Sequence, residues 1–159
     1  MTQKNLVVYY SYEGSTRLIA QTIAQTMDAD VLECKPAKDI QSKGIMKYVW
    51  GGRQVIFKKR PYLESFDTNP MDYEVIIIGT PVWAFDYAPA IRSFVSQANL
   101  TKKKIGLFCC HEGAIGKTLE NLKKVLSENT IIGEMDFLNV PKHTQENIEK
   151  AKKWATTLI

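Results

Sequence analysis

Leu6-Val7-Val8-Tyr9-Tyr10 is an apolar, β-branched run, and Ser11-Tyr12-Glu13-Gly14-Ser15-Thr16 follows it directly. The first part is typical of a buried β-strand, and the part rich in hydroxyls and glycine is typical of a turn. Beyond the turn, residues recur at the spacing of one helical face: Leu18, Ile19, Thr22, Ile23 and Met27. The stretch therefore predicts a strand that passes through a short turn into the N-terminus of a helix.

A turn of this kind can bind an anion. The first backbone N–H groups of a helix have no partner within it, and the helix dipole favours negative charge there. Ser11, Ser15 and Thr16 supply hydroxyl donors for phosphate oxygens, and Gly14 lets the backbone approach a ligand closely. Because Ser and Thr are also preferred helix caps, the turn alone leaves phosphate binding and ordinary capping both open.

The two common phosphate-binding motifs are absent from this turn. It contains neither G-x-G-x-x-G nor the Walker pattern G-x-x-x-x-G-K-[ST]. Residues 111–118 come close to the Walker pattern, but His111 stands where its first glycine belongs. A side chain there would obstruct the tight loop that wraps a phosphate. We therefore do not expect a nucleoside triphosphatase.

The bulk composition predicts a single domain over residues 1–159. The chain is 45% hydrophobic, which is enough for its own core, and it has three cysteines, an odd number. No charged start followed by an apolar segment of signal or membrane length is present, so we expect a cytoplasmic protein without membrane association. The net charge is +4, without a basic stripe interleaved with aromatic residues. This argues against nucleic acid and is compatible with an acidic protein partner.

Strands and helices are predicted to alternate along the chain. The apolar runs that predict strands are Leu6–Tyr10, Val31–Cys34, Val75–Ile78, Ile105–Cys109 and Ile131–Val140. Helical patterns occupy about 15–27, 43–57, 88–98, 116–127 and 144–158, and residues 58–73, with two prolines, are expected to be irregular. Five β-α units in succession predict an α/β fold, a doubly wound five-stranded parallel sheet with helices on both faces.

Ligands of such sheets bind at the carboxyl ends of the strands. Three predicted loops therefore matter: residues 11–16, 79–87 and 109–116. The second loop carries three aromatic residues, and Trp83 is the best candidate to stack on a flat ligand. Phe85 and Tyr87 could instead fold back onto the core. The third loop is small enough for its backbone amides to face a heteroaromatic edge.

Together, the three loops resemble the flavodoxin family, and the resemblance covers essentially the whole chain. The first loop resembles the family's hydroxyl-rich loop for the phosphate of flavin mononucleotide (FMN), and Gly79-Thr80-Pro81-Val82-Trp83 resembles the second flavin loop. Because the final strand runs straight into the last helix, the chain resembles the short members of the family. The resemblance implies these FMN-binding residues: Ser11, Tyr12, Glu13, Gly14, Ser15, Thr16, Thr80, Pro81, Val82, Trp83, Ala84, Phe85, His111, Glu112, Gly113 and Gly116.

Three features depart from the family pattern. Flavodoxins are typically acidic, whereas this chain carries a net charge of +4. Ala84 stands after Trp83, where a glycine would let the peptide turn toward reduced flavin, so the resemblance does not imply strong stabilisation of a half-reduced flavin. The third loop has no aromatic ring. Stacking on the second flavin face is therefore either missing or supplied by Tyr12 or Trp50.

The resemblance implies electron transfer through bound FMN to redox partner proteins. No Ser-His-Asp or metal-ligand constellation is apparent, so we assign no catalytic residues and no metal. One alternative is an NAD(P)H- or quinone-dependent FMN oxidoreductase on the same fold. Another is a domain that binds no flavin and acts as an interaction module.

The cysteines and one histidine have a plain structural interpretation. Neighbours on a strand point to opposite faces, so Cys109 and Cys110 are poor partners for each other and are expected in the core, as is Cys34. His111 lies near the predicted flavin, where it either tunes the cofactor or has no function.

Overall fold

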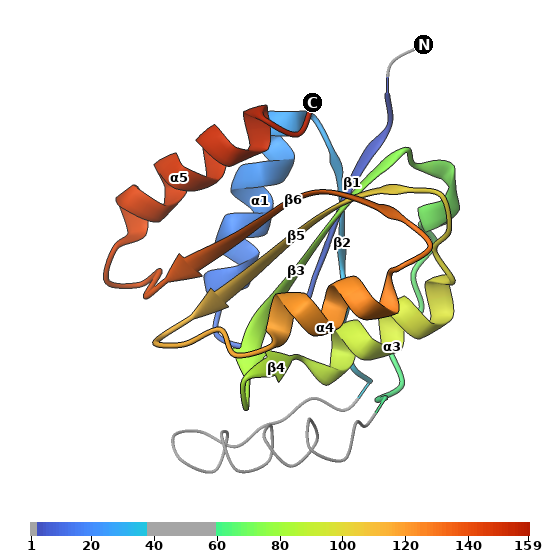
Figure 1. Cartoon of the computed structure of the whole chain (residues 1–159), viewed down its shortest axis with the longest axis horizontal. Helices are drawn as coiled ribbons and strands as arrows, with labels where there is room; N and C mark the ends of the chain where they lie inside the picture. The colour runs from blue at the N-terminus through green and yellow to red at the C-terminus, as the bar shows by residue number, and fades with distance from the viewer. Residues whose placement is uncertain (1–2, 38–59) are drawn as a thin grey trace.

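A parallel sheet with the strand order β2-β1-β3-β5-β6 forms the centre of the computed structural model, which describes residues 3–37 and 60–159 (Figure 1). Its strands are β1 (Asn5–Tyr9), β2 (Asp30–Glu33), β3 (Val75–Trp83), β5 (Lys104–His111) and β6 (Thr130–Leu138). A short strand, β4 (Asp86–Tyr87), pairs antiparallel with the end of β3. The α/β class and the doubly wound parallel sheet are thus as predicted.

Helices cover both faces of this sheet. In Figure 1, α1 (Ser15–Met27) and α5 (Thr144–Thr156) lie on one face, and α3 (Pro89–Ala98) and α4 (Thr118–Val125) lie on the other. The helix predicted over residues 43–57, with Trp50, lies outside the described residues. Among residues 3–37 and 60–159, no helix has the length and apolarity to cross a membrane.

The core divides into two clusters because successive strand residues point to opposite faces. On β1, Leu6 and Val8 pack toward α3 and α4, whereas Val7 and Tyr9 pack toward α1 and α5. The same alternation sends Cys109 and Cys110 into different clusters, as predicted. Burial raises the pKa of each thiol to about 12, and the same holds for Cys34.

The strand order reverses between β1 and β3. The chain adds β2 on one side of β1 and then crosses over to form β3 on the other side. The connections that leave β1 and β3 therefore turn to opposite faces of the sheet. This leaves a crevice between them at the carboxyl ends of the strands, the usual ligand site of such sheets.

The third strand is longer than predicted. It was expected to end at Ile78 with a loop from Gly79 to Tyr87, but β3 continues to Trp83 and stays paired with β5 as far as Pro81. Ala84 and Phe85 then turn the chain back into β4 with positive φ values of 48° and 62°. A two-residue hairpin turn with two positive φ values ordinarily contains Asn-Gly or Asp-Gly. The sequence Ala84-Phe85 therefore did not predict a hairpin here.

Other element boundaries shift only slightly from the predictions. The last strand ends at Leu138 rather than Val140 because Asn139 takes a positive φ of 47° and turns the chain toward α5. The predicted irregular stretch is irregular over residues 60–73. It holds a single antiparallel bridge between Leu63 and Pro36, and one short 3₁₀ helix, η1 (Pro70–Asp72).

Gly79 limits how the centre of the sheet can pack. A Cβ atom at Gly79 would lie 2.1 Å from Cζ of Phe108. That ring is held edge to face by Phe137 and Trp154, with centroid separations of 5.9 and 6.4 Å. We therefore expect Gly79→Ala to lower the free energy of unfolding by about 1–3 kcal/mol, the usual cost of overpacking, measured by urea titration.

Gly113 provides the matched control, because a Cβ atom there meets nothing within 4 Å. Gly113→Ala should leave the urea midpoint nearly unchanged. Equal stability of the two variants would show that the Phe108 ring yields freely and that Gly79 is not needed for packing.

Candidate functional site

The turn between β1 and α1 presents unpaired backbone donors. The first intrahelical hydrogen bond of α1 runs from Leu18 N to Gly14 O at 3.0 Å, so the amides of residues 15–17 lie ahead of it. Gly14 is the N-cap, with φ 106° and no side-chain cap, and the first turn of the helix has no acidic residue. Ser11 Oγ accepts the Gly14 N–H at 3.1 Å and so shapes the turn. The result is a helix N-terminus open to an anion.

The hairpin of β3 and β4 forms the second wall of the site. Thr80 Oγ1 accepts the Ala88 N–H at 2.9 Å, which joins the base of the hairpin to the start of α3. At the tip, Phe85 O accepts the Lys117 N–H at 3.0 Å. Gly116 packs so closely there that an added Cβ would lie 2.4 Å from Cβ of Phe85. The second and third loops are therefore tied to each other.

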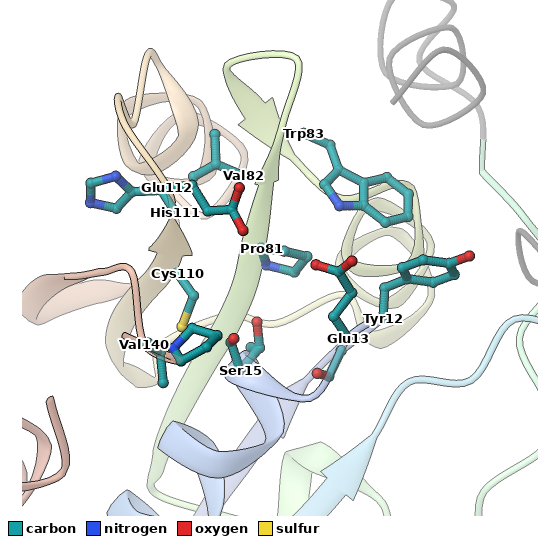
Figure 2. Close-up of a pocket in the computed structure, with 13 residues that line it drawn as sticks. Tyr12, Glu13, Ser15, Pro81, Val82, Trp83, Cys110, His111, Glu112 and Val140 are labelled. Carbon is teal, nitrogen blue, oxygen red and sulfur yellow. The ribbon is translucent and has the colours of Figure 1, made fainter. Parts of the chain in front are cut away.

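These loops and the chain beyond β6 enclose one cavity at the carboxyl ends of the strands (Figure 2). Its volume is about 650 Å³ when the open mouth is included. The residues that line it are Ser11, Tyr12, Glu13, Ser15, Thr16, Pro81, Val82, Trp83, Cys110, His111, Glu112, Val140 and Pro141. Residues of all three loops predicted from the sequence thus line this cavity.

The polar lining of the cavity has two chemical characters. At the start of α1, the hydroxyls of Ser15 and Thr16 stand beside the open amides and provide donors for an anion. Elsewhere, Glu13 and Glu112 direct carboxylates toward the middle of the cavity (Figure 2), where they provide acceptors for hydroxyl or N–H donors of a ligand. The arrangement suits a ligand with an anionic end and a neutral polar body.

An aromatic group lies on one side of the cavity. Trp83 meets Tyr10 and Tyr12 edge to face, with ring centroids 5.4 and 6.0 Å apart. Tyr10 is buried, whereas Tyr12 and Trp83 are half-buried and lie next to each other in Figure 2. Tyr12 therefore stands on the same side of the cavity as Trp83. Trp50, the other residue considered for stacking, lies outside the described residues.

His111 belongs to the cavity wall, but its ring does not face the cavity. Figure 2 shows the imidazole pointing away, and its Nε2 lies 2.6 Å from Oδ2 of Asp136 on the neighbouring strand β6. Asn139 N donates to His111 O at 2.8 Å, which joins the same strand ends through the backbone. His111 thus ties β5 to β6 next to the third loop.

Six of the sixteen residues predicted from the sequence lie outside the cavity lining: Gly14, Thr80, Ala84, Phe85, Gly113 and Gly116. Four of them shape the walls, since Gly14 caps α1, Thr80 holds α3, and Phe85 and Gly116 join two loops. Tyr87 is buried in the core, one of the two interpretations left open, whereas Phe85 is 66% exposed.

Three lining residues were missed by the sequence analysis: Cys110, Val140 and Pro141. Cys110 was expected in the core, and its thiol is indeed buried, but it also forms part of the cavity beside Thr16. Val140 and Pro141 follow β6, whose predicted end at Val140 concealed the loop. Predicting a fourth loop after the last strand would have found these two.

No metal centre is evident within the described ranges. In residues 3–37 and 60–159, no group of three or more His, Cys, Asp and Glu side chains is placed to hold a metal ion.

Comparison with solved structures identifies the fold. A protein from Bacteroides eggerthii described as a candidate flavoprotein matches with a TM-score of 0.81 and 22% identity, over 99% of this chain and 98% of that one. A flavoprotein from Lactobacillus acidophilus in complex with FMN matches with a TM-score of 0.71 and 22% identity, over 91% and 98%. Two-electron reduced flavodoxin from Megasphaera elsdenii matches with a TM-score of 0.59 and 19% identity, over 96% and 99%.

Comparison with curated proteins finds no match. A flavodoxin family model, by contrast, matches residues 4–157, nearly the whole chain. The strand order, the position of the cavity and this match agree with the resemblance seen in the three loops. The chain belongs to the flavodoxin family.

Proposed function

We propose that this protein binds FMN in the cavity of Figure 2 and transfers electrons to a partner protein. One observation carries the proposal: the open N-terminus of α1 and the aromatic hairpin end line the same cavity. Family membership and the FMN complex of a protein with the same fold support the choice of cofactor. When bound, the flavin supplies one- or two-electron chemistry.

The residues of the cavity fit such a cofactor. The amides of residues 15–17 with the hydroxyls of Ser15 and Thr16 would hold the phosphate, a role suited to a helix N-terminus. Trp83 would lie against the flavin ring, and Glu13 and Glu112 would accept hydrogen bonds from the ligand's hydroxyl or N–H groups. The protein's contribution is to bind and orient the cofactor.

The charge distribution bears on the partner. Residues 38–59 contain six of the 21 Lys and Arg residues but only one of the 17 Asp and Glu residues, so the rest of the chain is close to neutral. Attraction to an acidic partner would therefore depend on that segment. We propose that electrons pass to a redox partner protein. If that partner is acidic, its association with this chain weakens as salt is added.

Binding of FMN and riboflavin tests the proposal, because the two ligands differ only in the phosphate. We expect micromolar or tighter FMN binding, with the flavin fluorescence quenched. Ser15→Ala should weaken FMN binding by about 1–2 kcal/mol, or roughly five- to thirtyfold, the value of one hydrogen bond to a charged group. Riboflavin should bind the native protein and this variant equally.

Thr26→Ala is the matched control for Ser15→Ala, because Thr26 is a hydroxyl residue of the same helix that bonds Thr22 O in its last turn. It should leave both affinities unchanged. Equal losses of FMN and riboflavin binding in Ser15→Ala would mean that this turn does not bind the phosphate. Failure of the native protein to bind FMN would refute the proposal itself.

Trp83 allows a second prediction. If its ring contacts the flavin, FMN should quench tryptophan fluorescence, and Trp83→Leu should abolish most of that quenching. The affinity for FMN should fall about threefold to tenfold, as expected for one aromatic contact. Trp50→Leu is the comparison variant. Quenching that survives in Trp83→Leu but is lost in Trp50→Leu would contradict the assignment of the second loop.

The main alternative is an enzyme that oxidises NAD(P)H with a quinone. An electron carrier needs no nicotinamide site, so the FMN-loaded protein should oxidise NADH or NADPH no faster than free FMN when a quinone is present. Rapid, saturable oxidation in this steady-state assay would establish the alternative instead.

A further inference from the structure

The tip of the hairpin adopts a conformation that its residues do not favour. Ala84 and Phe85 have φ values of 48° and 62°, in the left-handed region that is unfavourable for residues with a side chain. Such a turn persists only where the surrounding structure holds it. On one side it is held by the Lys117 N–H and by the close approach of Gly116.

Arg92 holds the other side of the hairpin from α3. Its Nη2 lies 3.4 Å from Oδ2 of Asp86, and its Nη1 donates to Tyr87 Oη at 3.0 Å. The guanidinium carbon also lies 4.4 Å from the centroid of the Tyr87 ring. One side chain therefore contacts both residues of β4.

Asp86 connects Arg92 with a residue that lines the flavin cavity. Asp86 is the direct partner of Trp83 in the β3–β4 register, and Trp83 lines the cavity. Asp86 Oδ1 also accepts the Tyr87 N–H at 2.8 Å, which fixes the carboxylate that Arg92 engages. Asp86 is therefore held by Arg92 through its side chain and paired with Trp83 through the strand register.

Stability alone is a poor reason for an arginine here. The side chains of Arg92 and Asp86 are only 11% and 17% exposed. Arg92 Nε is buried and has no hydrogen-bond partner in the described part of the chain. Burying a charged pair with a donor left unpaired costs free energy, and apolar replacements of such pairs are often neutral or stabilising. The fork geometry of arginine, which reaches Asp86 and Tyr87 together, is what an apolar residue could not supply.

We infer that Arg92 is a positioning residue that holds Trp83 at the flavin cavity through Asp86. The effect of this placement on flavin binding rests on the proposed function. The placement of Trp83 itself does not require flavin. The side-chain hydrogen bonds and the ring contact of Arg92 in the described part of the chain go to Asp86 and Tyr87, neither of which lines the cavity.

The test follows Trp83 in the flavin-free protein. With 5-fluorotryptophan incorporated, Trp83 gives its own ¹⁹F NMR resonance, assigned by Trp83→Phe, and Trp154 on the opposite face of the sheet serves as a reference. In Arg92→Met, we expect the Trp83 resonance to shift and broaden while that of Trp154 stays in place. FMN affinity should fall about threefold to tenfold, up to the value of the aromatic contact.

Three further variants sharpen the test. Arg92→Lys keeps the charge without the fork, so it should move the Trp83 resonance in the same direction. Arg92→Met alone leaves the Asp86 carboxylate without its cation. The double variant Asp86→Asn/Arg92→Met removes both charges, so it should fold even if Arg92→Met does not. The double variant should lose no more FMN affinity than the weaker-binding of the two single variants, Arg92→Met and Asp86→Asn. Both substitutions break the same contact between Arg92 and Asp86. Lys104→Met removes an exposed ion pair with Glu74 at the start of β5, the end remote from the cavity. It should change neither the Trp83 resonance nor the affinity for FMN.

The outcomes separate cleanly. A Trp83 resonance that stays in place in folded Arg92→Met or in the double variant overturns the inference. Equal shifts of Trp83 and Trp154 overturn it too, because they indicate general loosening. If the Trp83 resonance shifts but the FMN affinity is unchanged, Arg92 does not contribute to FMN binding through Trp83. If the native protein binds no FMN, the proposed function fails, and the flavin-free ¹⁹F comparison still decides whether Arg92 places Trp83.

Discussion

The reversal of strand order between β1 and β3 determines where the cavity and the elements around it lie. Because β2 is added on one side of β1 and β3 on the other, the two connections separate and leave a crevice at the strand ends. The helix that leaves β1 must begin at this crevice, which places its unpaired amides there. The hairpin that ends β3 forms the facing wall. The two walls therefore face each other across the crevice.

Polar groups around the crevice divide into those that build it and those that face its interior. Ser11 accepts the Gly14 N–H, Thr80 accepts the Ala88 N–H, and His111 pairs with Asp136 on β6. These contacts hold the loops in place. The start of α1 and the carboxylates of the first and third loops face the cavity. These supporting contacts are made within the protein and do not need a bound cofactor.

The sequence was sufficient for the sheet, the helices on both faces and the three loops, since these follow from hydrophobic periodicity and from the topology of β-α units. It was insufficient where side-chain direction or an unusual backbone decides. Ala84-Phe85 has no hairpin signature, so the extension of β3 was missed. His111 was near the site by position, yet its ring turns toward Asp136. Cys110 was correctly expected to be buried, but burial does not reveal which buried residues border a cavity.

In the proposed function, the N-terminus of α1 binds the phosphate of FMN. The most direct measurement is a ¹H–¹⁵N correlation spectrum of the protein during titration with FMN and with riboflavin. We expect large downfield shifts of the Ser15, Thr16 and Arg17 amide protons with FMN and small ones with riboflavin, because only FMN brings an anion to these donors. Equal shifts with both ligands, or no shifts in this turn while FMN binds, would show that the N-terminus of α1 does not bind the phosphate.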